Sequence, residues 1–305
     1  MIRSSNTYIS KSKRANMVIL HISDLHLQKG SESDTVKYVI EPLIKSVVKF
    51  NVSKKIDAII FSGDLIDKGG ISYDKIDDGF YRFADLLIYP LLNAISLDEH
   101  RFFMVPGNHD IKRSMDSHII ENGLFTSLST EEAVNDFIVK CKNDGTDEGI
   151  KRMLPYKDFE EFIYSSVANK SLSKFSTDFI LDLDGSSVGI TCLNSSWRCY
   201  DSEKDKGNLL IGEYQIENSI DFIKDCDLKI AISHHSVDQL TDFERKIINA
   251  RLQSAYDMHF TGHVHQPDAD YIVHSFGKLY RSIAAGTLSS QMALLHGSCR
   301  VDLNA

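Results

Sequence analysis

The stretch RFFMVPGNHD, residues 101–110, joins a short apolar run to a glycine, an amide, an imidazole and a carboxylate. The run is apolar without alternation, which is typical of a strand covered on both faces. Four positions at its end, Gly107 to Asp110, carry groups that seldom serve packing. The stretch therefore predicts a buried strand that delivers polar side chains to one end of a sheet.

Other short runs repeat this pattern of Ile, Val and Phe bounded by polar residues, and they too are typical of buried strands. The runs are MVILHIS (17–23), DAIIFSG (57–63), SVGITCLN (187–194), KIAISHH (229–235) and DMHFTGH (257–263).

Between the runs, apolar residues recur at helical spacing, so strands and helices alternate and predict an α/β fold. The helical stretches are 34–50, 79–94, 212–225 and 242–256.

Composition divides the chain into an arm and one large domain. Residues 1–16 are polar and basic and lack the apolar core of a secretory signal, so we expect a flexible N-terminal arm. Residues 17–305 form the domain, and within it residues 111–180 are polar and mostly helical in pattern. We expect 111–180 to be a helical insertion or cap over one end of the sheet.

The final segment, GSCRVDLNA, follows a strand-like pattern directly, which leaves room for an additional domain or partner protein at that end.

Charge and cysteine content narrow the function classes. The net charge of −9 argues against nucleic-acid binding by the whole surface, although it permits a local basic groove. No apolar run is long enough to cross a bilayer, so we expect no membrane contact. The five cysteines include no CxxC pair, which argues against a disulfide framework or a zinc finger. A reducing cytoplasm is the expected location.

Polar motifs follow five of the six runs. The carboxyl ends of strands in an open α/β sheet meet at one crevice, so these groups should converge. Each motif alone is common by chance, but carboxylates, an amide and several imidazoles together are typical of a metal site. The motifs are SDLHL with Asp24 and His26, GDLIDKGG with Asp64, Asp67 and Lys68, GNHD with Asn108 and His109, SHHS with His234 and His235, and TGHVHQ with His263 and His265.

This ordered set resembles the calcineurin-like metallophosphoesterase superfamily, whose pattern is D-x-H, G-D-x-x-D-x-G, G-N-H-D, H-H and G-H-x-H. Two more segments, LNSSW (193–197) and LLIGEYQ (209–215), resemble its cyclic-nucleotide-phosphodiesterase-type branch. The resemblance implies a four-layer α/β/β/α sandwich of mixed sheets with two divalent metal ions at the strand ends. Manganese is the expected metal, with iron, zinc or nickel as alternatives, because imidazole nitrogen suits all four.

The resemblance also implies the ligand set. A bridging carboxylate fits, because its two oxygens can span cations about 3.5–4 Å apart. The implied ligands are Asp24, His26 and His265 for one metal, Asn108, His234 and His263 for the other, and Asp64 for both.

One motif departs from the family pattern, which usually shows His, any residue, then Pro. Here the run is His234, His235 and Ser236. Alignment by offset makes His234 the ligand and His235 a substrate-side neighbour, with the two exchanged as the alternative.

His109 is expected to face the substrate, because adjacent side chains in an extended segment diverge and Asn108 points to the metal. Asp67 stands where related protein phosphatases carry the Asp that orients this His, so His109 and Asp67 are the predicted catalytic pair. Lys68 stands where those phosphatases carry a phosphate-binding Arg. Lys68 and Arg198 are therefore predicted to contact substrate.

The resemblance implies a phosphoesterase that hydrolyses phosphodiester bonds with a metal-bridging hydroxide, and a nucleotide-type substrate is favoured. Alternatives are a nuclease acting on DNA or RNA, possibly an effector domain of a larger protein, and a phosphomonoesterase. A non-catalytic metal-binding scaffold is the alternative from a different class. The complete ligand set argues against the scaffold, since a degenerate module usually loses ligands.

Overall fold

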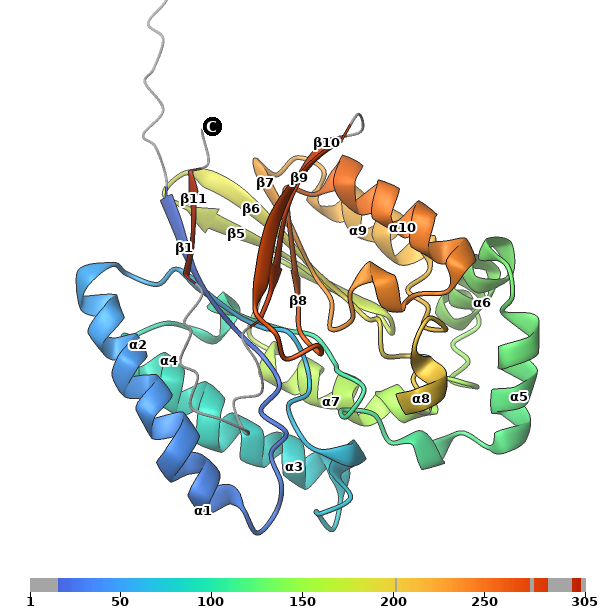
Figure 1. Ribbon diagram of the computed structural model, residues 1–305, viewed down its shortest axis with the longest axis horizontal. Coiled ribbons are helices and arrows are strands. Elements are labelled where there is room, and N and C mark those ends of the chain that lie inside the picture. The colour runs from blue at the N-terminus through green and yellow to red at the C-terminus, as the bar shows by residue number, and fades with distance from the viewer. Residues whose placement is uncertain (1–15, 201, 275–276, 285–297, 303–305) are drawn as a thin grey trace, which may run out of the picture.

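Two mixed β-sheets form the centre of the computed structural model, which describes residues 16–200, 202–274, 277–284 and 298–302 (Figure 1). The first sheet has the order β11-β1-β2-β3. Its parallel strands are β1 (Asn16–Ile22), β2 (Ala58–Phe61) and β3 (Phe102–Met104), and β11 (Ser298–Asp302) pairs antiparallel with β1.

The second sheet has the order β4-β5-β6-β7-β8-β10-β9, and its central strands β6, β7, β8 and β10 are parallel. Its edges are antiparallel pairs. The strands are β4 (Lys170–Leu172), β5 (Ser176–Leu183), β6 (Ser186–Leu193), β7 (Leu228–Ile232), β8 (Met258–Thr261), β9 (Asp268–His274) and β10 (Gly277–Ile283).

Helices cover the outer face of each sheet, so the four-layer α/β/β/α sandwich is confirmed (Figure 1). The first sheet carries α1 (Glu32–Thr35), α2 (Glu41–Ser53), α3 (Ile76–Phe83) and α4 (Tyr89–Ile95), joined by π-helical turns at Val36–Ile40 and Ala84–Ile88. The second sheet carries α9 (Glu213–Ile223) and α10 (Asp242–Ala255). Short 3₁₀ turns lie at Lys68–Gly70, Glu99–Arg101, Arg113–Met115, Lys151–Met153 and Val237–Gln239.

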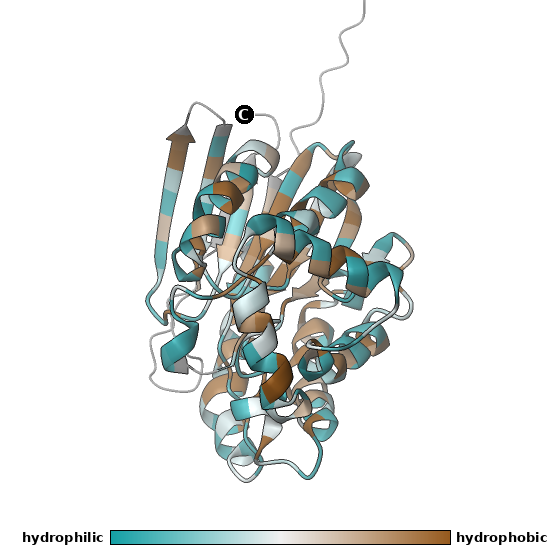
Figure 2. Cartoon of the chain, turned by 90° about the vertical axis from the view of Figure 1, so that its right-hand side faces the viewer, coloured by the Kyte–Doolittle hydropathy of each residue, from teal (hydrophilic) through white to brown (hydrophobic). Residues whose placement is uncertain are grey.

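The core lies where the two sheets face each other. The rings of Phe103 on β3 and Phe179 on β5 lie 5.1 Å apart, and the rings of His21 on β1 and Phe260 on β8 lie 5.0 Å apart. All three phenylalanines are buried. Figure 2 shows brown bands on the strands and alternating teal and brown on the helices, as expected for helices with one buried face.

The segment expected to be a helical insertion is helical over only part of its length. It contains α5 (His118–Ser127), α6 (Glu131–Asn143) and α7 (Leu154–Ile163), but β4 and most of β5 also lie within residues 111–180. The polar, mostly helical pattern of the segment gave no indication of a strand, yet β5 pairs with β6 along its whole length.

The helices of this segment reach both outer layers. On α7, Phe159 stacks on Phe80 of α3 with ring centres 5.2 Å apart. On α6, the Nζ atom of Lys142 lies 2.8 Å from the Oδ1 atom of Asn218 on α9. The segment therefore joins the helical layers of the two sheets at one end of the sandwich.

The expected N-terminal arm, residues 1–16, lies outside the described residues except for Asn16, which begins β1. Among the described helices, none combines the length and apolar character needed to cross a membrane.

Candidate metal centre

Parallel pairing of β1 with β2 continues into the loops that follow both strands. The backbone N–H of Asp24 donates to the carbonyl of Gly63 over 2.9 Å, and that of His26 donates to the carbonyl of Asp64 over 3.1 Å. These bonds fix the register of the two loops. The first and second motifs therefore lie side by side.

The backbone at this site is unusual. Of the described non-glycine residues, eight have a positive φ, and six of them belong to the predicted motifs. A left-handed conformation costs a residue with a Cβ about 1–3 kcal/mol, and such residues concentrate at functional sites. The six are Asp24, His26, Asp64, Lys68, His263 and His265.

Glycines in the motifs allow close approach of the loops. A Cβ on Gly107 would lie 2.0 Å from the Oδ1 atom of Asp64, and one on Gly63 would lie 2.4 Å from the Nδ1 atom of His234. Any larger residue at either position would displace a predicted ligand.

The first predicted ligand group is Asp24, His26 and His265, whose donor atoms all lie within 4.8 Å of one another. The Nε2 atom of His265 lies 3.1 Å from Oδ1 of Asp24, and that of His26 lies 3.8 Å from the same oxygen. The structure thus brings together residues that are separated by more than 230 positions in the chain.

The second predicted group forms around His234. Its Nε2 atom lies 3.2 Å from Oδ1 of Asn108 and 3.3 Å from Oδ2 of Asp64, and its ring centre lies 5.2 Å from that of His263. The same Asp64 oxygen lies 3.6 Å from Nε2 of His26 in the first group. Asp64 therefore sits between the two groups, where a bridging ligand is expected.

His234 and His235 have different hydrogen-bond partners. The Nδ1 atom of His234 lies 2.7 Å from the carbonyl oxygen of Ser62, and the Nδ1 atom of His235 lies 2.9 Å from Oγ of Ser195. Only His234 approaches Asn108 and Asp64, although His235 joins His234 and His263 in a further cluster of possible donors.

Burial and charge set the protonation of the cluster. Burial alone would raise the pKa of Asp64, but nearby imidazoles, His234 first, hold that pKa below its usual range. Burial lowers the pKa of His263 to about 4, and it lowers that of His235 well below its ordinary value. Near pH 7, Asp64 is therefore ionised and these imidazoles are neutral, which are the forms that bind cations.

His109 lies beside the metal groups and is paired with Asp67. Its Nδ1 atom lies 2.9 Å from Oδ1 of Asp67 and 3.1 Å from the backbone nitrogen of Lys68. When Nδ1 carries a proton it can donate to Asp67, and when it does not it can accept from the backbone N–H of Lys68. Gln28 donates to the other Asp67 oxygen over 2.9 Å and holds the carboxylate in place.

Asp110 is fully buried and supports the loop. Its two oxygens accept from the backbone N–H groups of Ile66 and Gly107 over 3.0 and 2.8 Å. Burial raises its pKa to about 8, with the charge of Asp64 acting in the same direction.

The predicted substrate-side residues separate into two kinds. Lys68 lies at the rim beside His109 with 70% of its side chain exposed, and its role remains a prediction. Arg198 is buried and donates to Glu121 over 2.8 Å. Its charge is paired inside the protein, and its contact with substrate stays a prediction.

Several residues around the centre were not predicted. A hollow of about 410 Å³ opens over the metal groups, and Asp205, Lys206 and Gln239 line it together with the predicted ligands. Ser196 donates to the carbonyl of Pro106 over 2.8 Å and so holds the 106–110 loop. The LNSSW segment was noticed only for its resemblance, and nothing in its residue types indicated this contact.

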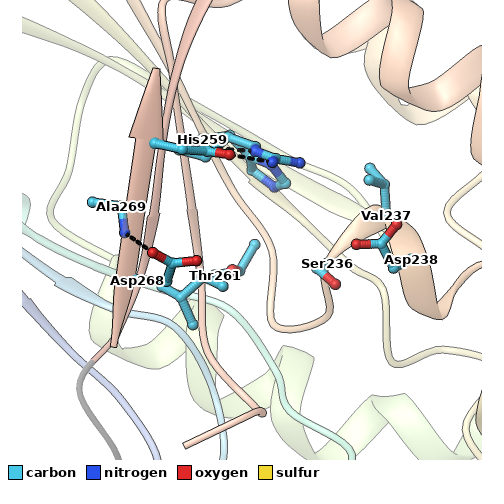
Figure 3. A pocket seen from close by; sticks show the side chains of 10 residues that line it. Ser236, Val237, Asp238, His259, Thr261, Asp268 and Ala269 are labelled. Atoms are coloured by element: carbon cyan, nitrogen blue, oxygen red, sulfur yellow. Dashed lines mark hydrogen bonds and ion pairs between the residues drawn. The ribbon is translucent and has the colours of Figure 1, made fainter. Parts of the chain in front are cut away.

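A smaller pocket of about 150 Å³ is lined by Ser236 and by residues of the second sheet, among them His259 (Figure 3). The Nε2 atom of His259 lies 2.9 Å from Oγ of Ser233, which donates to the carbonyl of His235 over 2.8 Å. His259 therefore supports the loop that carries the two adjacent histidines.

A family model, Calcineurin-like phosphoesterase, matches residues 17–267, which is most of the chain. The chain belongs to the calcineurin-like phosphoesterase family. Calcineurin-like phosphoesterases depend on two metals and hydrolyse phosphoric esters.

One curated member is 22% identical over 291 residues: the uncharacterized metallophosphoesterase-like protein YydB of Bacillus subtilis. The match covers 93% of this chain and 56% of YydB, so the chain spans little more than half the length of that relative.

Similar solved structures include a dimetal phosphatase from Danio rerio and GAP50, the anchor in the inner membrane complex of Plasmodium. The first is 13% identical with a TM-score of 0.46, covering 92% of this chain and 90% of its own. The second is 12% identical with a TM-score of 0.41, and the match covers 95% of this chain and 79% of the GAP50 chain.

The donor set fits two divalent metals. Two carboxylates, one amide oxygen and several imidazoles converge from five strand ends, and His234 uses its second nitrogen to hold the Ser62 carbonyl. Such outer contacts fix the ring so that the free nitrogen faces the ion. The carboxylates and imidazoles of the two groups also match the ligand types preferred by manganese, iron and zinc.

Proposed function

We propose that this protein is a dinuclear-metal phosphodiesterase and that its substrates are of the nucleotide type. The observation that carries the proposal is the His109–Asp67 pair, with its 2.9 Å contact, beside the cluster built around Asp64. A scaffold that only holds metals has no need of an oriented imidazole outside the ligand set. Manganese is the proposed metal.

The proposed roles follow from the contacts. Bound dications would activate a water molecule and neutralise phosphate charge. Asp67 accepts from Nδ1 of His109, and a second proton, taken up from solvent on Nε2 to give the imidazolium, can then be passed to the departing oxygen. Asp64 and Asn108 would hold the dications, which would in turn bind the phosphate oxygens. No Ser or Cys nucleophile is required.

The proposed compartment is the cytoplasm. It is supported by the four described cysteines, Cys141, Cys192, Cys199 and Cys226, which are buried and form no disulfide with one another.

The test is hydrolysis of bis-p-nitrophenyl phosphate by the purified protein with Mn²⁺, beside p-nitrophenyl phosphate as the monoester comparison. We expect turnover of both and a higher kcat/KM for the diester. Preference for the monoester would favour a phosphomonoesterase. Absence of turnover with every dication tried, at full metal occupancy, would favour the non-catalytic scaffold.

A further inference from the structure

A second hollow, of about 610 Å³, adjoins the first at His109. The two hollows share Asn108 and His109. The predicted metal ligands His26, His263 and His265 line only the first hollow, whereas the second runs from Lys68 to Ile76 and from Asn108 to Ser114. The second hollow thus adjoins the reacting position without being part of the metal centre.

The charge of the second hollow is opposite to that of the whole chain. Lys68, Lys112 and Arg113 line it, and the side chains of Lys68 and Arg113 are 70% and 33% exposed. One carboxylate, Asp74, also lines it, but Lys29 pairs with that carboxylate over 2.6 Å. Two of the cations also lie near carboxylates outside the lining, Lys68 3.7 Å from Oδ2 of Asp67 and Arg113 3.9 Å from Oδ2 of Asp205. Three cations and one carboxylate nevertheless line the hollow itself on a chain of net charge −9, which favours an anionic ligand.

The basic rim is held in a fixed position relative to His109. Gly69 donates to the carbonyl of His109 over 2.7 Å, and Lys112 donates to that of Arg152 over 3.1 Å. Arg152 is fully buried and pairs with Asp116 over 3.0 Å and with Glu121. This buried ion cluster anchors the backbone after the GNHD loop, so the backbone that carries Lys112 and Arg113 is fixed relative to His109.

Part of the lining is apolar. Ile71 is 80% exposed at the rim, and Ile76 and Ile111 form a buried part of the wall. A surface with both cations and exposed aliphatic groups suits a ligand that carries a phosphate on an organic ring, more than it suits a free inorganic anion.

We propose that this hollow binds the leaving half of a phosphodiester whose leaving group carries a further phosphate, as in an oligonucleotide. The proposal rests on the proposed function: if His109 protonates the departing oxygen, the leaving group lies on the His109 side, where this hollow begins. The scissile phosphate then sits over the metal ligands, and the next phosphate along reaches Lys112 and Arg113. A cyclic nucleotide has no second phosphate and leaves these cations unused.

Binding gives the first test, with thymidine 3′,5′-bisphosphate and thymidine 5′-monophosphate as probes in calorimetry of the Mn²⁺-loaded protein. We expect the bisphosphate to bind about tenfold or more tightly than the monophosphate. The exposed Lys112→Ala change should reduce that advantage, and the double variant Lys112→Ala, Arg113→Ala should abolish it. Lys45→Ala, which removes a 77% exposed lysine on α2, is the matched control and should retain it.

Turnover gives the second test. It compares kcat/KM for two forms of the dinucleotide dTpdT, one with a phosphate at both ends and one with no terminal phosphate. We expect a preference for the phosphorylated form that the double variant loses. Equal Kd values for the two nucleotides in the wild type, or an advantage that survives the double variant, would overturn the hollow as a phosphate site. If the bisphosphate binds tightly and the double variant weakens that binding, but no ester is turned over, the hollow is a phosphate site and the proposed function is overturned instead.

Discussion

The Nδ1 atom of His109 lies 2.9 Å from the Oδ1 atom of Asp67, 42 positions earlier in the chain. The contact crosses from the loop after β3 to the loop after β2. It orients the His109 ring through Nδ1 and does not involve the other ring nitrogen.

Asp67→Asn removes the negative charge but keeps the size of the side chain. We expect kcat to fall about 10- to 100-fold, because the amide orients the imidazole less firmly. Metal content, measured by elemental analysis, should stay at the wild-type value. Asp98→Asn, at a 75% exposed carboxylate, is the control and should change neither quantity. Loss of metal in Asp67→Asn would instead place Asp67 among the ligands, because its Oδ1 also lies 3.8 Å from Nδ1 of His26 and the two form a group of possible donors with His109.

His109→Ala should lower kcat by about 10²–10⁴-fold, the range for removal of a general acid. Both metals should remain bound, because neither predicted ligand group requires this imidazole. His100→Ala, at a side chain that is 46% exposed, serves as the control. An empty metal site in His109→Ala would contradict the assigned role.

Asp64→Asn should abolish turnover and lower occupancy at both metal positions together. The reason is that one Asp64 oxygen faces His26 of the first group and His234 of the second. Titration of the metal-free variant with Mn²⁺ measures the two affinities. A variant that lost one metal and kept the other at full affinity would rule out bridging.

His234→Ala and His235→Ala should differ in metal content. His234 contacts both Asn108 and Asp64, whereas His235 is held by Ser195, so only the first change should empty a position. Equal losses in the two variants would show that both imidazoles are ligands.

The five motifs allowed the metal centre to be predicted, because parallel strands bring their carboxyl ends to one edge whatever the detailed backbone. The local conformation could not be predicted in the same way. A left-handed backbone at Asp24 or His263 contradicts the preference of each residue and arises only from the loops that surround it. Similarly, β5 was missed because Asp178 and Asp182 interrupt its apolar pattern, although pairing with β6 makes it a strand. The pairing of Arg198 with Glu121 could not be predicted either, because the two residues lie 77 positions apart.

Glu244→Gln should stabilise the protein in a manner that depends on pH. Burial raises the pKa of Glu244 to about 7, and its Oε2 atom accepts from the backbone N–H of Ile211 over 2.8 Å. The folded state therefore holds a proton that the unfolded state releases near pH 4.5, so the wild type loses stability as the pH rises from about 4.5 to 7.

Glutamine keeps the acceptor without the charge. The variant should gain up to about 3 kcal/mol over the wild type at pH 8 and little at pH 4.5. Urea unfolding at the two pH values measures the difference. A gain that is the same at both values would rule out ionisation of Glu244 as its cause.

The left-handed residues of the centre have a consequence for attempts to make this protein more robust. At Asp24, His26, Asp64, Lys68, His263 and His265 the backbone conformation favours glycine. A screen that selects only for heat resistance would therefore tend to recover glycine at these positions, and each such gain would remove a side chain that the chemistry is proposed to use. In this protein, selection for stability and selection for activity oppose each other at the same few residues.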